Sequence, residues 1–164
     1  MLEVLNLGNN KLNDTFPFWL ESLSELKILV LRANGFYGPI WDPHINFGLS
    51  KLHVIDLSHN NFFGKLPSNY FQNWSAIQGV IDNDKSQTGY MGDGSNYYKD
   101  LMTIVNKGVE LELVKILTIF TAIYLSNNQF YGEILDSIGN LKALIVINLS
   151  SNNFTSHIPS SWET

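Results

Sequence analysis

Hydrophobic residues in this chain follow one pattern that recurs along its length. The pattern LxxLxLxxNx(L/F) occurs five times, in copies that begin at Leu2, Leu26, Leu52, Phe120 and Leu144. These starts are 24, 26, 68 and 24 residues apart, so the period is about 24 residues with one long interruption. Self-similarity at a fixed period of this length predicts a solenoid, in which stacked coils bury one another's apolar faces.

Within each copy, alternating apolar residues predict a short β-strand with one buried face, and stacked copies would pair these strands in a parallel sheet. The residues expected to point inward are Leu5 with Leu7, Leu29 with Leu31, Ile55 with Leu57, Ile123 with Leu125, and Ile147 with Leu149. An asparagine follows each strand where the chain turns into the interior. These residues are Asn10, Asn34, Asn60, Asn128 and Asn152. An inward amide supplies both a donor and an acceptor to backbone groups that the turn strands, so we interpret them as a structural ladder.

An apolar residue stands two positions after each asparagine. This spine consists of Leu12, Phe36, Phe62, Phe130 and Phe154, which we expect to stack from coil to coil. In three copies, FYGPI, FFGKLP and FYGEI, a glycine follows at Gly38, Gly64 and Gly132. The glycine before an apolar residue predicts a tight turn into a second short extended segment.

The 68-residue interval contains one repeat and about 44 residues that break the period. We therefore divide the chain into repeats 1–3 at 1–75, an insert at 76–119 and repeats 4–5 at 120–164. Residues 79–96 are rich in Gly, Asp, Asn, Ser and Tyr, which is typical of a surface loop. Residues 101–105 and 109–113 then predict two strands joined by a turn at Lys107 and Gly108, and hence a β-hairpin.

Composition narrows the function classes. The 164 residues are 45% apolar and 15% charged, with a net charge of -5 and a pI near 5.2. No basic cluster suits nucleic acid. The absence of cysteine excludes a thiol nucleophile and cysteine-ligated metal sites. Neither a signal peptide nor a stretch of the roughly 20 apolar residues that span a bilayer is expected in this fragment.

Catalytic and metal-binding interpretations are weak. Asp56, Ser58 and His59 adjoin in an ordinary repeat, but a catalytic triad is defined by geometry and not by nearness in sequence. The four histidines lack zinc-ligand spacing. Residues from Asp82 to Asp93 partly match a calcium loop, but Gln87 replaces the glycine of its sharp turn. We therefore expect no catalytic residue, metal or cofactor, and no enzyme activity.

Three long segments resemble one family. They are residues 13–31 (NDTFPFWLESLSELKILVL), 52–74 (LHVIDLSHNNFFGKLPSNYFQNW) and 107–160, which opens KGVELELVKILTIFTAIYLSNNQFYGEI. They look like the membrane-proximal ectodomain of plant leucine-rich-repeat receptor-like proteins of the disease-resistance (Cf/Ve) type. The resemblance implies an α/β leucine-rich-repeat solenoid of the plant-specific type, with a short parallel β-sheet on its concave face. The non-repeat insert corresponds to the island domain of that family.

The resemblance also implies a function. The parent protein would be a cell-surface immune receptor at the extracellular side of the plasma membrane, without a kinase of its own. It would sense an extracellular protein or peptide elicitor and pair with co-receptor and adaptor receptor kinases. A secreted inhibitor of a pathogen cell-wall-degrading enzyme and a truncated, non-functional receptor remnant remain alternatives. We expect a fragment without caps to be marginally folded or aggregated when expressed alone.

Candidate contact residues follow from this interpretation. On the concave sheet, the positions between the leucines are expected to be exposed, and aromatic residues and arginine dominate interface energetics. The candidates there are Arg32, Asp56, His59 and Tyr124, with Asn148, Ser150 and Ser151 as secondary ones for a co-receptor. In the insert they are Tyr90, Tyr97, Tyr98 and Lys107, although these tyrosines could equally pack the insert onto the solenoid. Candidate N-glycosylation sites are Asn13, Asn73, Asn148 and Asn153, and a glycan on Asn148 would block the concave face.

Overall fold

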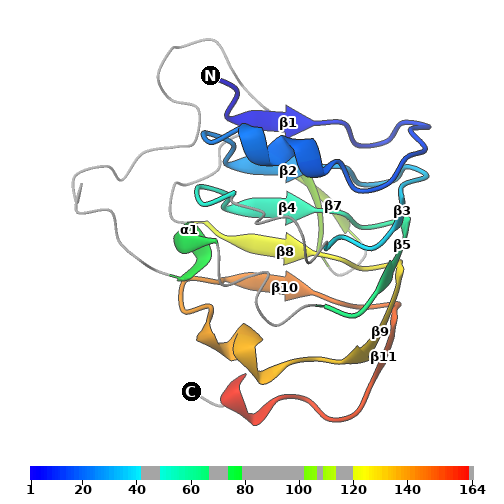
Figure 1. Ribbon diagram of the computed structural model, residues 1–164, viewed down its shortest axis with the longest axis vertical. Coiled ribbons are helices and arrows are strands. Elements are labelled where there is room, and N and C mark those ends of the chain that lie inside the picture. The colour runs from blue at the N-terminus through cyan, green and yellow to red at the C-terminus, as the bar shows by residue number, and fades with distance from the viewer. Residues whose placement is uncertain (42–48, 67–73, 79–101, 107–108, 114–119, 163–164) are drawn as a thin grey trace.

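The computed structural model describes residues 1–41, 49–66, 74–78, 102–106, 109–113 and 120–162. We number the five repeat copies as coils 1 to 5. Each coil contributes one strand to a five-stranded parallel sheet in which neighbours keep a continuous register, and Figure 1 shows these strands stacked in a column. In spatial order the strands are β1 (Val4–Asn6), β2 (Ile28–Val30), β4 (Val54–Asp56), β8 (Ala122–Tyr124) and β10 (Val146–Asn148). The predicted solenoid and its parallel sheet are confirmed.

A second parallel sheet runs along the solenoid where the chain has turned out of the first. Its strands, in spatial order, are β11 (Asn153–Thr155), β9 (Gln129–Glu133), β5 (Asn61–Gly64) and β3 (Tyr37–Gly38). Gly38, Gly64 and Gly132 have φ of 85°, 110° and 89°, in the left-handed region that favours glycine. The turn is thus at the glycine, as predicted. The second strand, however, lies mainly before and at this glycine, because the spine residues Phe62 and Phe130 already pair with Gly38 and Gly64 of the preceding coil.

Short helices lie across the core from the five-stranded sheet (Figure 1). They are the 3-10 helices η1 (Phe18–Ser22), η3 (Asp136–Asn140) and η4 (Ser160–Trp162) and one α-helical turn, α1 (Ser75–Gln78). In η1 the backbone N–H of Leu20 donates to Pro17 O, and in η3 the N–H of Ile138 donates to Leu135 O. These i to i+3 bonds are characteristic of the tighter 3-10 geometry. Leu20 of η1 and Ile138 of η3 are buried, so each of these two helices packs an apolar residue into the core.

The core lies between the strands and the short helices. Phe36, Phe62 and Phe130 stack along it, with ring centroids 6.0 Å and 6.5 Å apart and interplanar angles of 7° and 14°. The predicted inward residues of coils 2 to 4 are buried, and those of coils 1 and 5 pack against the same cluster while staying partly exposed. The end coils are more exposed because only one neighbour covers them.

The asparagine ladder joins each coil to the next. Asn60 Nδ2 donates to the carbonyl oxygens of Leu31 at 3.0 Å, Leu57 at 3.1 Å and Ser58 at 3.2 Å. Its Oδ1 accepts from the backbone N–H of Phe36 at 3.1 Å. The equivalent bonds recur at Asn34, Asn128 and Asn152. At these four positions, one amide therefore satisfies backbone groups of two coils.

The insert contributes an antiparallel hairpin of β6 (Met102–Asn106) and β7 (Val109–Leu113). Its register pairs Met102 with Leu113 and Asn106 with Val109. Figure 1 shows this hairpin on the side of the five-stranded sheet away from α1 and the 3-10 helices. None of the helices in the described ranges is long and apolar enough to cross a membrane.

Candidate functional site

The outward face of the five-stranded sheet carries the concave residues selected from sequence. In coils 2 to 4 this face is buried, and its apolar members are Ile28, Val30, Val54, Ala122 and Tyr124. The expectation that these positions are exposed is therefore wrong. This face is therefore not an open groove in coils 2 to 4, and Figure 1 shows the β6–β7 hairpin on the same side of the sheet.

Polar candidates share this burial. Arg32 is 8% exposed, Asp56 is 2% exposed and Tyr124 is 6% exposed, so their predicted exposure is also wrong. Desolvation raises the pKa of Asp56, while hydrogen bonds from Ser58 and attraction to Arg32 and His59 partly offset it. Burial also raises the pKa of Tyr124, and the negative charge of Asp56 adds to that effect. These side chains form a buried polar cluster within an apolar face.

Asp56 has a local structural role that the repeat explains. Its Oδ1 accepts from the backbone N–H of Ser58 at 2.9 Å and from the Ser58 hydroxyl. Asn6 accepts from the N–H of Gly8 in the same way at 3.0 Å, and Asn148 accepts from the N–H of Ser150 at 3.1 Å. Side-chain oxygens of Asp and Asn commonly accept from a backbone N–H two residues on and so begin a turn. Asp56 thus ends its strand as the two neutral amides end theirs.

The same geometry argues against nucleophilic catalysis. The Ser58 hydroxyl donates to Asp56, whereas a triad requires it to donate to a histidine. His59 instead is exposed, and its Nε2 lies 3.3 Å from Asn127 Nδ2. Within the described ranges, no group of three or more His, Cys, Asp or Glu residues is placed to hold a metal ion.

A stability measurement separates the effect of the Asp56 charge from the effect of its hydrogen bond in the turn. Asp56→Asn keeps the acceptor oxygen and removes the ionisation. Because the folded pKa is raised above the ordinary value near 3.8, the folded state holds this proton more tightly than the unfolded chain. The stability that the wild type gains from Asp56 is therefore present at low pH and lost as the pH rises through the folded pKa. Urea unfolding at several pH values should show Asp56→Asn gaining stability relative to the wild type as the pH rises from the ordinary value near 3.8 through the raised folded pKa. A difference that does not vary with pH would contradict this explanation.

An exposed row of polar residues lies just after strands β4, β8 and β10. We call His59, Asn127, Ser150 and Ser151 the polar rim, and all four are exposed. His59, Asn127 and Ser151 each have φ between 53° and 55°, and backbone bonds from His59 N to Ser126 O and from Asn127 N to Ser150 O tie the three coils together. The rim therefore offers neutral hydrogen-bonding groups on a rigid backbone. Asn148 beside it is half-buried.

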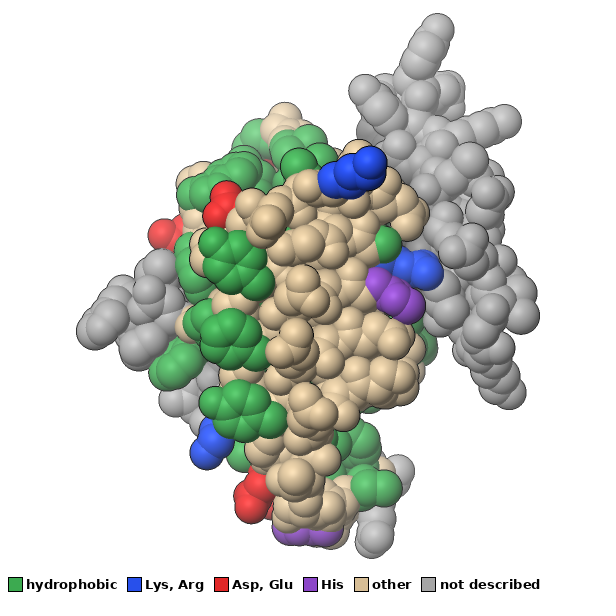
Figure 2. Space-filling view, turned by 90° about the vertical axis from the view of Figure 1, so that its right-hand side faces the viewer, with side chains coloured by type: hydrophobic (Ala, Val, Ile, Leu, Met, Phe, Trp, Pro, Cys, Tyr) green, Lys and Arg blue, Asp and Glu red, His purple; other side chains and the backbone are tan. Residues whose placement is uncertain are grey.

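A second exposed surface was not anticipated from the sequence. Tyr37, Phe63 and Tyr131 are 46%, 45% and 47% exposed and lie on successive strands β3, β5 and β9 of the second sheet. Figure 2 shows hydrophobic side chains in a column along this face. The signal was present, because each residue directly follows a spine phenylalanine and so must point to the opposite face of its strand. We call this set the aromatic column.

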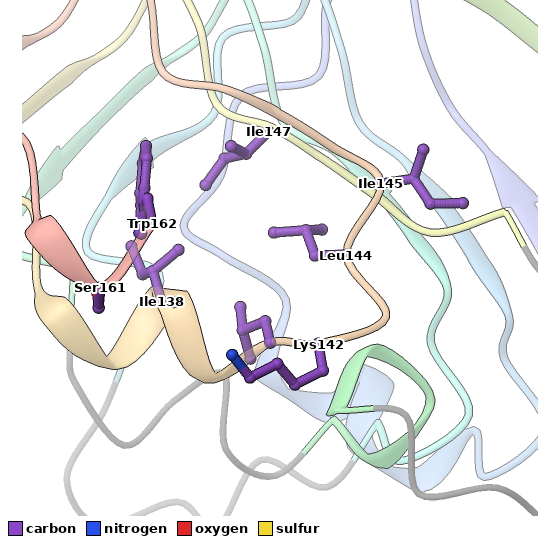
Figure 3. A pocket seen from close by; sticks show the side chains of 9 residues that line it. Ile138, Lys142, Leu144, Ile145, Ile147, Ser161 and Trp162 are labelled. Carbon is purple, nitrogen blue, oxygen red and sulfur yellow. The ribbon is translucent and has the colours of Figure 1, made fainter. Parts of the chain in front are cut away.

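A cavity of about 240 Å³ opens at the coil 5 end of the solenoid. Figure 3 shows Ile138, Leu144, Ile147 and Trp162 around it, with the amine of Lys142 at its edge. Its walls are the apolar positions that an interior coil would cover with its successor.

Other sequence candidates are distributed as follows. Asn13 and Asn153, two candidate glycosylation sites, are exposed, and the half-buried Asn148 uses its side-chain oxygen in the turn described above. Five further candidates lie outside the described residues: Asn73, Tyr90, Tyr97, Tyr98 and Lys107.

Comparison with known proteins agrees with this architecture. The family model described as Leucine Rich Repeat matches residues 1–23, 51–74, 120–141 and 143–164. The chain is 56% identical over 146 residues to Receptor-like protein 43 of Arabidopsis thaliana, an alignment of 88% of this chain and 20% of that protein. It is 56% identical over 144 residues to Receptor-like protein 32 of the same plant, covering 87% of this chain and 16% of that protein. The chain thus spans a fifth or less of these two relatives.

Solved structures show the same fold. The ectodomain of the Arabidopsis receptor kinase GASSHO1/SCHENGEN3, solved in complex with CASPARIAN STRIP INTEGRITY FACTOR 2, superposes with a TM-score of 0.63 at 26% identity over 98% of this chain and 14% of that one. The Arabidopsis BIR3–SERK2 complex gives a TM-score of 0.63 at 21% identity, over 96% of this chain and 60% of that one. Repeat sequence, ladder geometry and these matches agree, and the chain belongs to the leucine-rich-repeat family.

Proposed function

We propose that this chain is the protein- or peptide-binding part of a plant cell-surface immune receptor-like protein, which senses an elicitor and pairs with co-receptor kinases. The observation that carries the proposal is the 56% identity to Receptor-like protein 43, because an alignment of 146 residues must include most of the insert as well as the repeats. That similarity favours a receptor over the secreted inhibitor, because an inhibitor built from regular repeats would be expected to lack the insert. The parent protein would present this chain at the extracellular side of the plasma membrane.

Burial decides which residues are available to a partner. Arg32, Asp56 and Tyr124 are too enclosed to contact a macromolecule directly, so we assign them to holding the sheet in shape. His59 and Asn127 are exposed, contact each other and stand on adjacent coils. Rigid polar groups at a solenoid edge suit the hydrogen bonds of an extended peptide backbone. We therefore place the elicitor or co-receptor contact on the polar rim.

A variant pair in the intact parent receptor tests this assignment. His59→Ala with Asn127→Ala should weaken the elicitor-dependent complex with a co-receptor kinase by about tenfold, the effect of losing one interface hot spot. Apoplastic extract from infected leaves serves as the elicitor source, and co-immunoprecipitation from leaf membranes measures the complex. Both residues are exposed, so the amount of receptor at the cell surface should not change.

The aromatic column supplies the matched control. Tyr37→Ser with Tyr131→Ser changes two residues of comparable exposure on the other sheet, and we expect complex formation to persist. Loss of the complex in this control, with retention in the rim variant, would move the contact to the aromatic column and refute the assignment. If both variants still formed the complex and signalled normally, neither surface would be needed for receptor function, and the proposal for this region would be wrong.

A further inference from the structure

The aromatic column is an exposed apolar surface that belongs to the inner coils. Tyr37, Phe63 and Tyr131 are each nearly half exposed, and they lie on β3, β5 and β9, which are adjacent strands of the second sheet. Coils 2 to 4 each lie between two others, so the rings stay exposed however the stack continues. Large apolar side chains that gather on one face, as Figure 2 shows, indicate that something packs there.

An asparagine side chain stands directly beside this column. Strand β11 pairs with β9 in parallel, and its register sets Asn153 opposite Tyr131 and Thr155 opposite Glu133. Neighbouring strands lie about 4.8 Å apart, and residues paired in this way point to the same face of a sheet. Asn153, Thr155 and Tyr131 are all exposed, so the three side chains share the outward face.

The outward orientation of Asn153 follows from its place in the repeat. Asn153 is the first residue after the ladder asparagine of its coil, and Asn61 and Gln129 hold the same place in coils 3 and 4. Both of these residues are exposed, although each of their coils has a neighbour on either side. The side chain of Asn153 therefore points to solvent because of the repeat, and not because its coil is the last one in the sequence.

Asn153, Phe154 and Thr155 form an acceptor sequence for N-glycosylation, Asn-x-Thr. Strand geometry separates the three residues, because Phe154 packs against the core while Asn153 and Thr155 face outward. A glycan on Asn153 would therefore displace no core residue. Asn148 differs, because it is half-buried and its side-chain oxygen already accepts hydrogen bonds from Ser150.

Charged side chains border the same surface. The methylene groups of Lys65 lie over Gly132, and a Cβ added to this glycine would be 3.2 Å from Lys65 Cγ. Glu133 follows Gly132 on the same strand, and both Lys65 and Glu133 are exposed. Their charged groups can hydrogen-bond hydroxyl groups. An apolar stripe with polar groups beside it suits a carbohydrate better than a purely apolar partner.

We propose that Asn153 carries an N-linked glycan and that the first sugars of this glycan pack on the aromatic column. The N-acetylglucosamine joined to Asn153 lies against Tyr131, and the following sugars continue over Phe63 toward Tyr37. The C–H groups on one face of a sugar ring are apolar, so this packing removes them and the aromatic rings from water while the hydroxyl groups stay hydrated. The inference rests on the proposed function, since only a parent protein that enters the secretory pathway is N-glycosylated.

Mass spectrometry of the intact parent receptor, purified from leaf membranes, tests whether the glycan is present. Peptide-N-glycosidase A converts a glycosylated asparagine to aspartate, which marks the occupied site, and we expect Asn153 to be marked. If Asn13 or Asn73 is marked and Asn153 is not, the inference is wrong and the receptor function stands. If no asparagine of the receptor is marked, the protein has not entered the secretory pathway, and both the inference and the proposed function are wrong.

Hydroxyl-radical footprinting of the same receptor tests whether the glycan covers the column. Thr155→Ala removes the acceptor sequence and leaves Asn153 and Tyr131 in place. Oxidation of Tyr131 should be about threefold faster in this variant, because the ring is 47% exposed without a sugar above it. Thr15→Ala, which removes the acceptor sequence of Asn13 on coil 1, is the control and should leave the rate at Tyr131 unchanged.

Asn153→Gln gives the same comparison if Thr155→Ala does not reach the cell surface. An equally fast rate in the wild type and the variants, with Asn153 occupied, would show that the glycan extends into solvent and would overturn its packing on the column. Protection of Tyr131 in the variants without the glycan would also overturn it, and would assign the column to a second copy of the chain or to another protein.

Discussion

Replacing Asn60 by alanine is expected to lower the free energy of unfolding by about 3 to 5 kcal/mol, because it removes four hydrogen bonds inside the protein. The carbonyl oxygens of Leu31, Leu57 and Ser58 each lose the bond from the amide, and the N–H of Phe36 loses its acceptor. A buried polar group left without a partner costs its desolvation, which exceeds the net gain from forming the bond. Urea unfolding of the dilute monomer measures the change.

Asn10→Ala is the matched control for this substitution. Asn10 holds the same repeat position, but its side chain is exposed and bonds only to carbonyls of its own coil. Water can replace these bonds, so we expect a loss of about 1 kcal/mol or less. Equal losses at the two positions would mean that the ladder between coils does not hold the stack together.

Replacing Phe62 by alanine is the second change with a large expected effect, a loss of about 3 to 5 kcal/mol. The ring is 0% exposed and stacks between those of Phe36 and Phe130, 6.0 Å and 6.5 Å away. Its removal leaves a cavity between two coils that the ladder holds at a fixed spacing, so the core cannot collapse to fill it. Thermal unfolding followed by circular dichroism gives the change in stability.

The adjacent Phe63 separates core packing from the mere presence of an aromatic ring. Phe63 is 45% exposed on the opposite face of the same strand, and Phe63→Ala should cost about 0.5 kcal/mol. If both variants lost similar stability, the spine would not be the core of this solenoid.

The repeat made the fold predictable because its period reports burial. Leu29, Ile55 and Ile123 occupy the same position in coils 2, 3 and 4. All three are buried, since each of these coils lies between two others. The ladder was predictable for the same reason, since an asparagine that recurs at a turn into the interior must satisfy the backbone there. Only the second strand was misplaced, because the glycine lies at the end of that strand, or one residue before its end in β9, and not before its beginning.

The candidate site was harder to predict because it depends on contacts outside the period. Val54 and Asp56 read as exposed positions of an ordinary strand, yet both are buried, on the side of the sheet where the hairpin lies. The pattern within a repeat does not report burial that arises from segments outside the repeat. His59, by contrast, follows the strand and remains exposed, as the sequence predicted. The aromatic column was overlooked because its residues were interpreted as part of a turn motif.

The most direct test of this account compares two tyrosines that the repeat alone would treat as equally open. Tyr124 on the concave face is 6% exposed, and Tyr131 on the second sheet is 47% exposed. Hydroxyl-radical footprinting of the folded full-length chain, read by mass spectrometry, should show Tyr131 oxidised readily and Tyr124 protected until the protein unfolds. Oxidation of Tyr124 as fast as that of Tyr131 would show that the concave face is open, and would contradict the placement of the contact surface on the polar rim.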